Sequence, residues 1–302
     1  MVSEPEESQI DLLGTVEVLH QYLTDGLCRD VFERLRQGER RRTWPLEVLA
    51  RFWTAVILRA PPSLTHALAE ASGGQGAYPE TGGTDQGFFA RCKSLSGDFF
   101  AEVFSAFQDA VRRNEPAYFG GQHQALLERF GQIFIIDGST LDQVARRLKI
   151  LRNDRRVPLP GAVVALYDLA RGTLAGLDFD RVPQGKEVLG ARRLLPTAPE
   201  GSLCVADALY GLPHFFNSLG ERGLWGLTRR NKRAHLAKER RLSRKNLAGG
   251  LFEDWIVVQG KKPTEPQQLR WIRWSKGSKS LELLTNVLDP SKLSAQDAVE
   301  LY

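Results

Sequence analysis

The sequence predicts an α/β protein in which a helical N-terminal region is followed by a mixed β-sheet with helices on its faces. Residues 10 to about 130 carry apolar residues at helical spacing, for example in LEVLARFWTAVIL at 46–58. At Ile133 the pattern changes to short runs rich in Val, Ile and Leu that are bounded by Gly or Pro, as β-strands are. Helix-like segments separate the later runs, and this alternation favours a mixed sheet flanked by helices.

Capping residues and apolar faces support the helical region. Ser63 follows two prolines and precedes an apolar-periodic segment, so it is a candidate N-cap. The segment 96–113 places four apolar residues on one helical face: Phe99, Val103, Phe107 and Val111. The glycine-rich segment 72–85 lacks the residue order of a nucleotide-binding loop and is interpreted as a linker.

The sheet is predicted from four β-like runs, at 133–136, 161–170, 172–182 and 201–211. Only Arg-Gly separates the second run from the third, which indicates a hairpin. Helices are expected before and after the fourth run, at 186–198 and 213–223, and a short strand is expected at 224–230.

The last part of the chain predicts a β-rich insertion at about 231–285 and a short final helix. Three strand-like runs fall in this part, at 252–259, 268–276 and 280–288. Ser294 and Asp297 have the spacing of N-cap and N3, and the helix that they begin has about two turns where the sequence ends. We therefore expect a helical domain at 1–130 and a sheet domain at 131–302 whose final helix is cut short.

The composition is that of an ordinary globular protein. Of the 302 residues 42% are apolar and 25% are charged, and no apolar run reaches the length of a membrane span. The acidic N-terminus is unlike a targeting segment, and the three cysteines are far apart and have no metal-ligand spacing. These features predict a cytoplasmic protein with no membrane partner.

Positive charge is concentrated in the segment 229–245. This segment holds nine Lys/Arg and one Glu, a local charge of +8 against +5 for the whole chain, so the remaining residues sum to −3. Such a patch suits a polyanionic partner, although a solvated basic loop or helix face gives the same pattern. A second basic cluster lies at 146–156. The candidate nucleic-acid-binding residues of the first segment are Arg229, Arg230, Lys232, Arg233, Arg240, Arg241, Arg244 and Lys245.

Two apolar runs end in an aspartate. Asp137 follows Ile-Phe-Ile-Ile, and Asp207 ends the run that begins near Ser202. If the two strands are adjacent and parallel, both carboxylates lie at the same edge of the sheet. Close carboxylates are stabilised by a cation, and Mg²⁺ prefers carboxylate oxygens and waters. Two such ions roughly 3.5–4 Å apart can act on the attacking and leaving oxygens of a phosphodiester.

Other interpretations of these residues were weighed. Each aspartate alone is commonly a turn or helix-cap residue. An aspartyl-phosphate hydrolase would need a second Asp two positions after Asp137, where this chain has Ser139. Ser139 lacks the GxSxG turn of a hydrolase nucleophile. Weaker carboxylate candidates are Asp142, Asp154 and Asp168, because none of them ends an uninterrupted apolar run.

Four short blocks in order resemble the DDE transposases of the insertion-sequence-four type. They are IDGSTL at 136–141, VADALYG at 205–211, GLTRRNK at 226–232 and LLTNVLD…AVELY at 283–302. The resemblance covers roughly 130–302. It implies a ribonuclease-H-like catalytic core with a β insertion between the second and third acidic residues. It also implies cleavage and strand transfer at insertion-sequence ends, dependent on Mg²⁺ or Mn²⁺ with two ions.

The resemblance assigns roles to individual residues. Asp137 resembles the first acid and Asp207 the second, and both would be catalytic metal ligands. Arg229 resembles an arginine that contacts DNA phosphates, and Tyr302 resembles the tyrosine that opens the family's last motif. The third acid, a Glu seven residues after that tyrosine, would lie beyond this sequence. The expected partners are double-stranded DNA and a second copy of the chain on DNA, in the cytoplasm of a bacterium and associated with the nucleoid.

Three alternatives remain open from the sequence. One is the transposase itself, and another is a truncated remnant that binds DNA without cutting it. A small-molecule α/β enzyme is the third. Trp255, Trp271 or Trp274 of the insertion could stack on an unpaired base, as a tryptophan of this region does in some relatives, or fill the small core of the insertion. Of these, Trp271 is the DNA-binding candidate.

Overall fold

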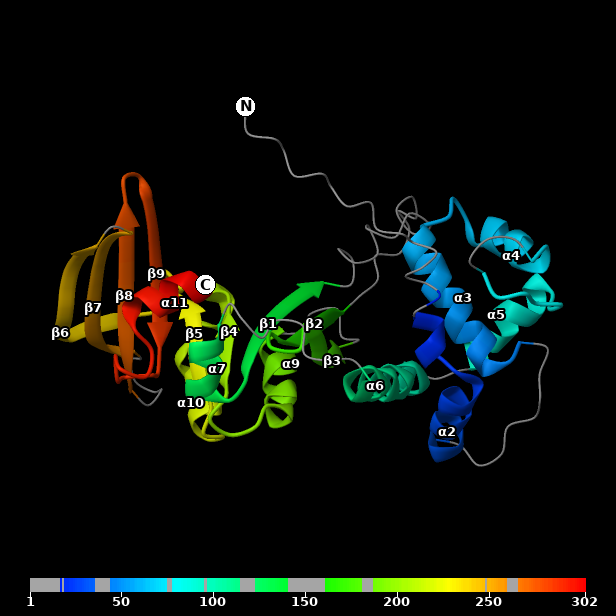
Figure 1. Ribbon diagram of the computed structural model, residues 1–302, viewed down its shortest axis with the longest axis horizontal. Coiled ribbons are helices and arrows are strands. Elements are labelled where there is room, and N and C mark those ends of the chain that lie inside the picture. The colour runs from blue at the N-terminus through cyan, green and yellow to red at the C-terminus, as the bar shows by residue number, and fades with distance from the viewer. Residues whose placement is uncertain are drawn as a thin grey trace. The chain divides into compact units, whose positions relative to one another are not determined.

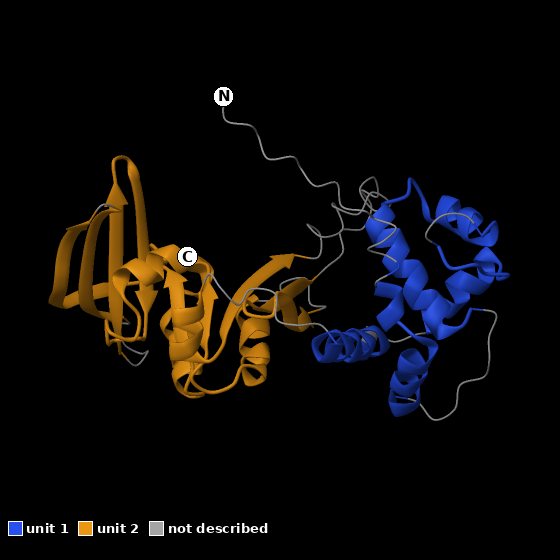
Figure 2. Ribbon diagram, viewed as in Figure 1, with its two compact units in different colours: residues 1–115, 142–159 blue, residues 116–141, 160–302 orange. Residues whose placement is uncertain are grey.

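The chain divides into two compact units, which Figure 2 shows in different colours. The first unit comprises residues 1–115 and 142–159, and the second comprises residues 116–141 and 160–302. The computed structural model describes residues 17, 19–35, 44–74, 78–94, 97–114, 123–140, 161–180, 187–247, 249–259 and 266–302.

Every secondary-structure element described in the first unit is a helix. Its helices are α2 (Asp25–Leu35), α3 (Leu46–Arg59), α4 (Leu64–Ser72), α5 (Asp85–Ser94) and α6 (Gly97–Asn114). Trp44, Phe52 and Phe88 form the aromatic centre of one core, with ring centroids 5.1–5.6 Å apart. The predicted N-cap is present, since the Ser63 side chain accepts a hydrogen bond from the His66 amide at 3.1 Å.

The second unit is built on one nine-stranded sheet in the order β3-β2-β1-β4-β5-β9-β8-β7-β6 (Figure 1). The strands are β1 (Ile133–Thr140), β2 (Ala162–Asp168), β3 (Thr173–Asp180), β4 (Leu203–Ala206), β5 (Trp225–Arg229), β6 (Leu236–Leu247), β7 (Gly250–Gln259), β8 (Gln267–Lys276) and β9 (Lys279–Thr285). The pairings of β1 with β4 and of β4 with β5 are parallel, whereas the other six pairings among the described strands are antiparallel. The sheet is therefore mixed, and the predicted α/β class is confirmed.

Helices cover both faces of the sheet. Phe134 and Ile136 of β1 belong to a core that includes residues of α9 (Glu187–Leu194) and α10 (Pro213–Gly220). Ile133 belongs to a second core with residues of α7 (Gln124–Phe130) and α11 (Ala295–Leu301). Three of the four apolar residues of the run at 133–136 are therefore buried on one face or the other, whereas Ile135 is 37% exposed. None of the described helices has the length and apolar character needed to cross a membrane.

The strand β6 was not predicted. Most of the basic segment forms this strand, at the outer edge of the sheet, and it pairs only with β7 (Figure 1). Its residues are exposed or half-buried throughout, so the sequence lacks the apolar alternation by which strands are recognised. Lys and Arg on an edge strand also discourage pairing with other chains, which is a structural reason for this composition.

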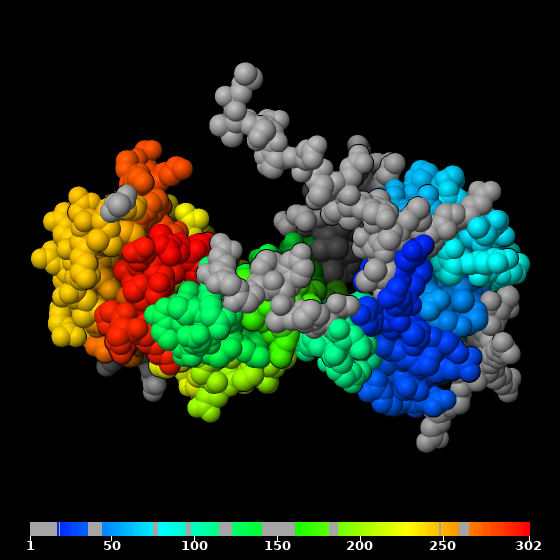
Figure 3. Space-filling model, in the orientation of Figure 1, coloured from blue at the N-terminus to red at the C-terminus, as the bar shows by residue number. Residues whose placement is uncertain are grey.

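In the second unit the last described helix, α11, contacts the first, α7. α7 and α11 lie side by side (Figures 1 and 3), and Arg129 of α7 pairs with Asp297 of α11 at 3.0 Å. The predicted cap of α11 is confirmed, because the Ser294 side chain accepts a hydrogen bond from the Asp297 amide at 3.0 Å.

Loss of this cap gives a testable stability change. Replacing Ser294 with alanine is expected to lower the free energy of unfolding by about 1 kcal/mol, because the Asp297 amide loses its acceptor at the start of the helix. Urea denaturation of the full chain measures this change. Ser280→Ala, at an exposed position of β9, is the matched control and should change the free energy by less than about 0.5 kcal/mol. Equal effects of the two substitutions would contradict the capping role.

Candidate functional site

The candidate site lies where β4 ends, beside the middle of β1. These strands are adjacent and parallel, and Ile136 of β1 is in register with Ala206 of β4. The next residue after each of them is an aspartate, so Asp137 and Asp207 occupy matching positions. β4 ends before Asp207, whereas β1 continues past Asp137 to Thr140 and pairs there with β2, so this strand is longer than the predicted apolar run. Both aspartates are exposed, next to the buried Ile136 and Ala206.

Local hydrogen bonds hold both carboxylates. Asp137 accepts a hydrogen bond from the Gly138 amide at 2.9 Å. Asp207 is the N-cap of the short 3-10 helix η2 (Ala208–Tyr210) and accepts from the Leu209 amide at 2.8 Å. Within the described residues neither carboxylate forms an ion pair with Lys or Arg, so their negative charge is open to a cation from solvent.

A third carboxylate lies beside this pair. Glu187 begins α9, and its carboxyl group rests against the α-carbon of Gly138: a β-carbon built at position 138 would lie 2.9 Å from both Cδ and Oε2 of Glu187. Partial burial raises the pKa of Glu187, and the charges of Asp207 and Asp137 raise it further. This neighbour was not predicted from the sequence, because an acidic residue in the first turn of a helix is common.

Tyr210 lies beneath the site. Its side chain is 1% exposed and packs in the same core as Ile136 of β1 and Ala191 of α9. Within the described residues its hydroxyl is buried without a hydrogen-bond partner. Burial raises the pKa of Tyr210, and the charges of Glu187, Asp207 and Asp137 add to that rise, which places the hydroxyl within electrostatic reach of all three carboxylates.

Tyr302 and Arg229 lie on the side of the site next to Asp207. Tyr302 is 39% exposed. Burial and the charge of Asp207 raise its pKa, while the charge of Arg229 and a hydrogen bond with the Arg229 backbone lower it. Arg229 and Tyr302, the two DNA-binding candidates that the family resemblance singles out, are therefore near each other and near the second aspartate.

A row of cations and tryptophans extends from the end of β5 across the insertion. Arg230 lies over the ring of Trp271 at 4.9 Å, and Lys238 lies over the same ring at 4.8 Å. Lys238 also lies 4.4 Å from the ring centre of Trp255, and Arg241 lies 5.5 Å from it. We call Arg230, Trp271, Lys238, Trp255 and Arg241 the cation–tryptophan row. Cation–π contacts hold long basic side chains in defined positions.

The tryptophans of the insertion are positioned as structural residues. Trp271 is 7% exposed and belongs to the core, and Trp255 is half-buried beside it. Trp274 donates a hydrogen bond to the Gly249 carbonyl at 2.8 Å. This placement favours the core-filling interpretation of Trp271 over base stacking, since its ring is buried and covered by two cations.

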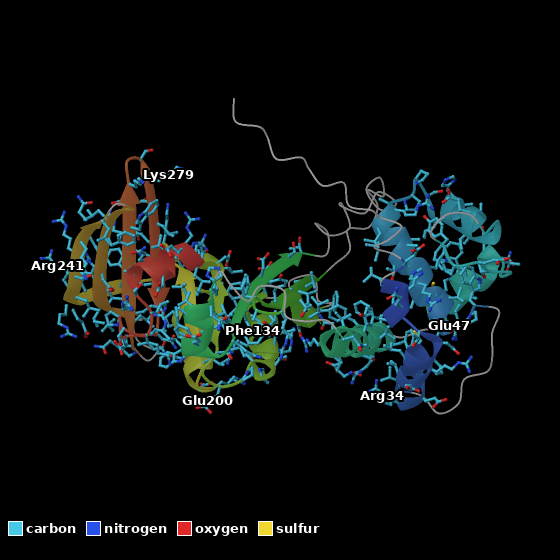
Figure 4. The ribbon with its side chains drawn as sticks, in the orientation of Figure 1. Arg34, Glu47, Phe134, Glu200, Arg241 and Lys279 are labelled. Atoms are coloured by element: carbon cyan, nitrogen blue, oxygen red, sulfur yellow. The ribbon has the colours of Figure 1, made fainter. Side chains whose placement is uncertain are left out.

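The other predicted basic residues are exposed along β6 and the turn before it. They are Lys232, Arg233, Arg240, Arg241, Arg244 and Lys245. Figure 4 shows Arg241 at the outer edge of the sheet. Arg230 differs from them, because it is half-buried and donates to Glu282 at 2.6 Å. The second basic cluster at 146–156 lies outside the described residues, as do Asp142 and Asp154.

The chemistry of the site suits a hard divalent cation. Within the described part of the chain no three His, Cys, Asp or Glu side chains form a group that could hold a metal ion. Mg²⁺ is commonly bound by one or two carboxylates, with waters and substrate phosphates as its remaining ligands. Asp137 and Asp207, exposed and without a cationic partner among the described residues, fit that requirement.

Comparison with known proteins does not place the chain in a family. No model of a protein family matches it, and no curated protein matches it. The function is therefore argued from the site.

Proposed function

We propose that the chain is a DNA-processing enzyme of the DDE transposase class, which cleaves DNA at the ends of an insertion sequence and transfers the freed strand. The observation that carries the proposal is the register of β1 and β4, which brings Asp137 and Asp207 together without a cationic partner among the described residues. A mixed sheet with helices on both faces and a β-rich extension after Asp207 agrees with the ribonuclease-H-like core and insertion that the resemblance implies.

The residues of the site have distinct tasks in this reaction. Asp137 and Asp207 would hold one or two Mg²⁺ or Mn²⁺ ions and leave the solvent side open to a phosphate. A bound ion would supply Lewis-acid chemistry, namely polarisation of the phosphodiester and a lower pKa of the attacking water. Attack of water breaks the bond to the 3′ oxygen and leaves a 3′-hydroxyl and a 5′-phosphate. Attack of that 3′-hydroxyl on a target phosphodiester joins the strands and releases a 3′-hydroxyl of the target. Arg229 and Tyr302, close to Asp207, contact the DNA next to the reacting phosphate.

The cations of the insertion supply DNA affinity. Lys238 and Arg241 lie against tryptophan rings, so less side-chain entropy is lost when they contact phosphates. The exposed Lys and Arg of β6 add further phosphate contacts, which do not depend on base sequence. A second copy of the chain on the DNA and a location at the bacterial nucleoid complete the proposal.

A DNA-binding protein that does not cut is the second candidate. It is favoured by the same cation–tryptophan row and by the fact that the described residues hold no three-ligand metal group. A small-molecule enzyme is the third, and it would not need the +8 charge of segment 229–245.

Metal-dependent nicking separates these functions. The full chain is expected to nick an end-containing duplex in Mg²⁺ or Mn²⁺, and Asp137→Asn is expected to abolish nicking because it removes a metal-binding carboxylate. Nicked product is measured on denaturing gels. Glu221→Gln, an exposed residue after α10, is the charge-matched control and should leave the rate unchanged. Binding without nicking would support the second candidate, and no salt-dependent DNA affinity would support the third.

A further inference from the structure

The position of Glu187 suggests that this residue takes part in the candidate site, although it was not predicted from the sequence. Its carboxyl group occupies the space that a side chain at position 138 would take, next to Asp137. The helix α9 that carries it packs against β1 and β2 through Ala191 and Leu194. The position of Glu187 is therefore fixed by the core of the second unit.

The buried hydroxyl of Tyr210 is an independent sign that a polar group belongs at this place. A buried donor without a partner costs about 1–3 kcal/mol, and native proteins rarely leave one unsatisfied. Tyr210 packs in the same core as residues of α9 and β1, and the charges of all three carboxylates help to raise its pKa. A water or hydrated ion among these carboxylates would give the hydroxyl an acceptor.

The chemistry of Mg²⁺ explains how a third carboxylate acts without binding the metal directly. The ion dehydrates reluctantly and keeps several of its waters in protein sites. Residues beyond the direct ligands orient those waters, and their loss typically weakens metal binding by about 10–100-fold. Glu187 does not belong to a three-ligand group with Asp137 and Asp207, so a water-mediated contact is the one that suits it.

We propose that Glu187 is a positioning residue of the site: its carboxylate accepts a hydrogen bond from a water of the divalent cation held by Asp137 and Asp207. The Tyr210 hydroxyl donates a hydrogen bond to a water of the same hydrated cation. This inference rests on the proposed metal site and adds one residue to it.

Binding of Mn²⁺ alone tests the proposal. The dissociation constant of the full chain for Mn²⁺, measured by electron paramagnetic resonance of the free ion, is expected to rise about 10–100-fold in Glu187→Gln. Gln has the size of Glu, so the fold is retained, which circular dichroism verifies, but it lacks the negative charge that strengthens a hydrogen bond from a metal-bound water. Glu221→Gln removes the same charge from the surface and should leave the constant unchanged.

Gly138 gives a test of position as distinct from charge. Gly138→Ala introduces a methyl group 2.9 Å from the Glu187 carboxyl and must displace it, although no charge is lost. If this substitution acts through Glu187, it weakens Mn²⁺ binding in the wild-type background and has little further effect in Glu187→Gln. A role of Glu187 in fold stability alone would leave the Mn²⁺ constant of both variants at the wild-type value.

The outcomes distinguish this inference from the proposed metal site. If the wild-type chain shows no Mn²⁺ binding that Asp137→Asn removes, both the metal site and the role of Glu187 are overturned. If Asp137→Asn removes binding but Glu187→Gln binds Mn²⁺ like the wild type, the metal site stands and the role of Glu187 is overturned. Fully additive effects of Gly138→Ala and Glu187→Gln would also overturn the proposed contact.

Discussion

Replacing Asp254 with alanine is expected to lower the free energy of unfolding of the second unit by about 3–5 kcal/mol. Asp254 is 2% exposed, and both of its carboxylate oxygens accept from Nε of Arg270, at 2.8 and 2.9 Å. Arg270 is fully buried and also donates to the Leu293 carbonyl at 2.6 Å. Without Asp254 the guanidinium would be a buried charge without its counterion, and this cost dominates the effect.

The measurement is urea denaturation of the full chain, followed by tryptophan fluorescence. Asp109→Ala, which removes an exposed ion pair with Arg112 in the first unit, should cost no more than about 1 kcal/mol. A double variant, Asp254→Leu with Arg270→Met, should recover much of the loss, because it removes both buried charges. A cost for Asp254→Ala as small as that of Asp109→Ala would contradict the buried-charge explanation.

Removing two cations of the cation–tryptophan row is expected to weaken DNA binding by roughly 10- to 100-fold at 0.1 M salt. The variant is Lys238→Ala with Arg241→Ala, two exposed residues that lie against Trp255. Each phosphate contact contributes about 0.9 to the slope of log affinity against log salt concentration, so the slope should fall by about 2.

The control double variant also removes two positive charges, but from a different part of the sheet. Lys276 and Lys279 are exposed at the β8–β9 turn, where Figure 4 labels Lys279 apart from Arg241. Lys276→Ala with Lys279→Ala should change the slope by clearly less than 2. Fluorescence anisotropy of a labelled duplex over a salt series measures both. Equal slopes for the two double variants would show that net charge, and not the row, determines binding.

The aspartate pair could be predicted because its signal is local. Two apolar runs are each followed by Asp, and the structure meets the condition on which the pair depended, that the two strands are adjacent and parallel. The strand β6 could not be predicted, because an edge strand exposed to water on both faces has no apolar alternation. Glu187 was also out of reach, since its proximity to Gly138 arises from the packing of α9 on the sheet and from no spacing in the chain.

The burial of Arg270 on β8 has no signal in the sequence either. Arg270 lies next to Trp271 along the strand, and neighbouring strand residues face opposite sides of a sheet. The structure buries both, Trp271 under the cations of one face and Arg270 against Asp254 and the Leu293 carbonyl on the other. A charged side chain is expected at the surface unless its counterion is known. Here the counterion is separated from Arg270 along the chain, so the sequence does not indicate the ion pair.

The insertion and the candidate site share one continuous sheet. β5 is bonded to β9 through the pairs Leu227–Thr285, Thr228–Leu284 and Arg229–Leu283, so no hinge separates β6 from β4. Five strand-to-strand steps lie between β6 and β4. At roughly 4.8 Å each they span about 24 Å. That length equals about seven base-pair steps of B-DNA at roughly 3.4 Å each. The hydrogen-bonded sheet thus sets the spacing between the outermost cations and the aspartates.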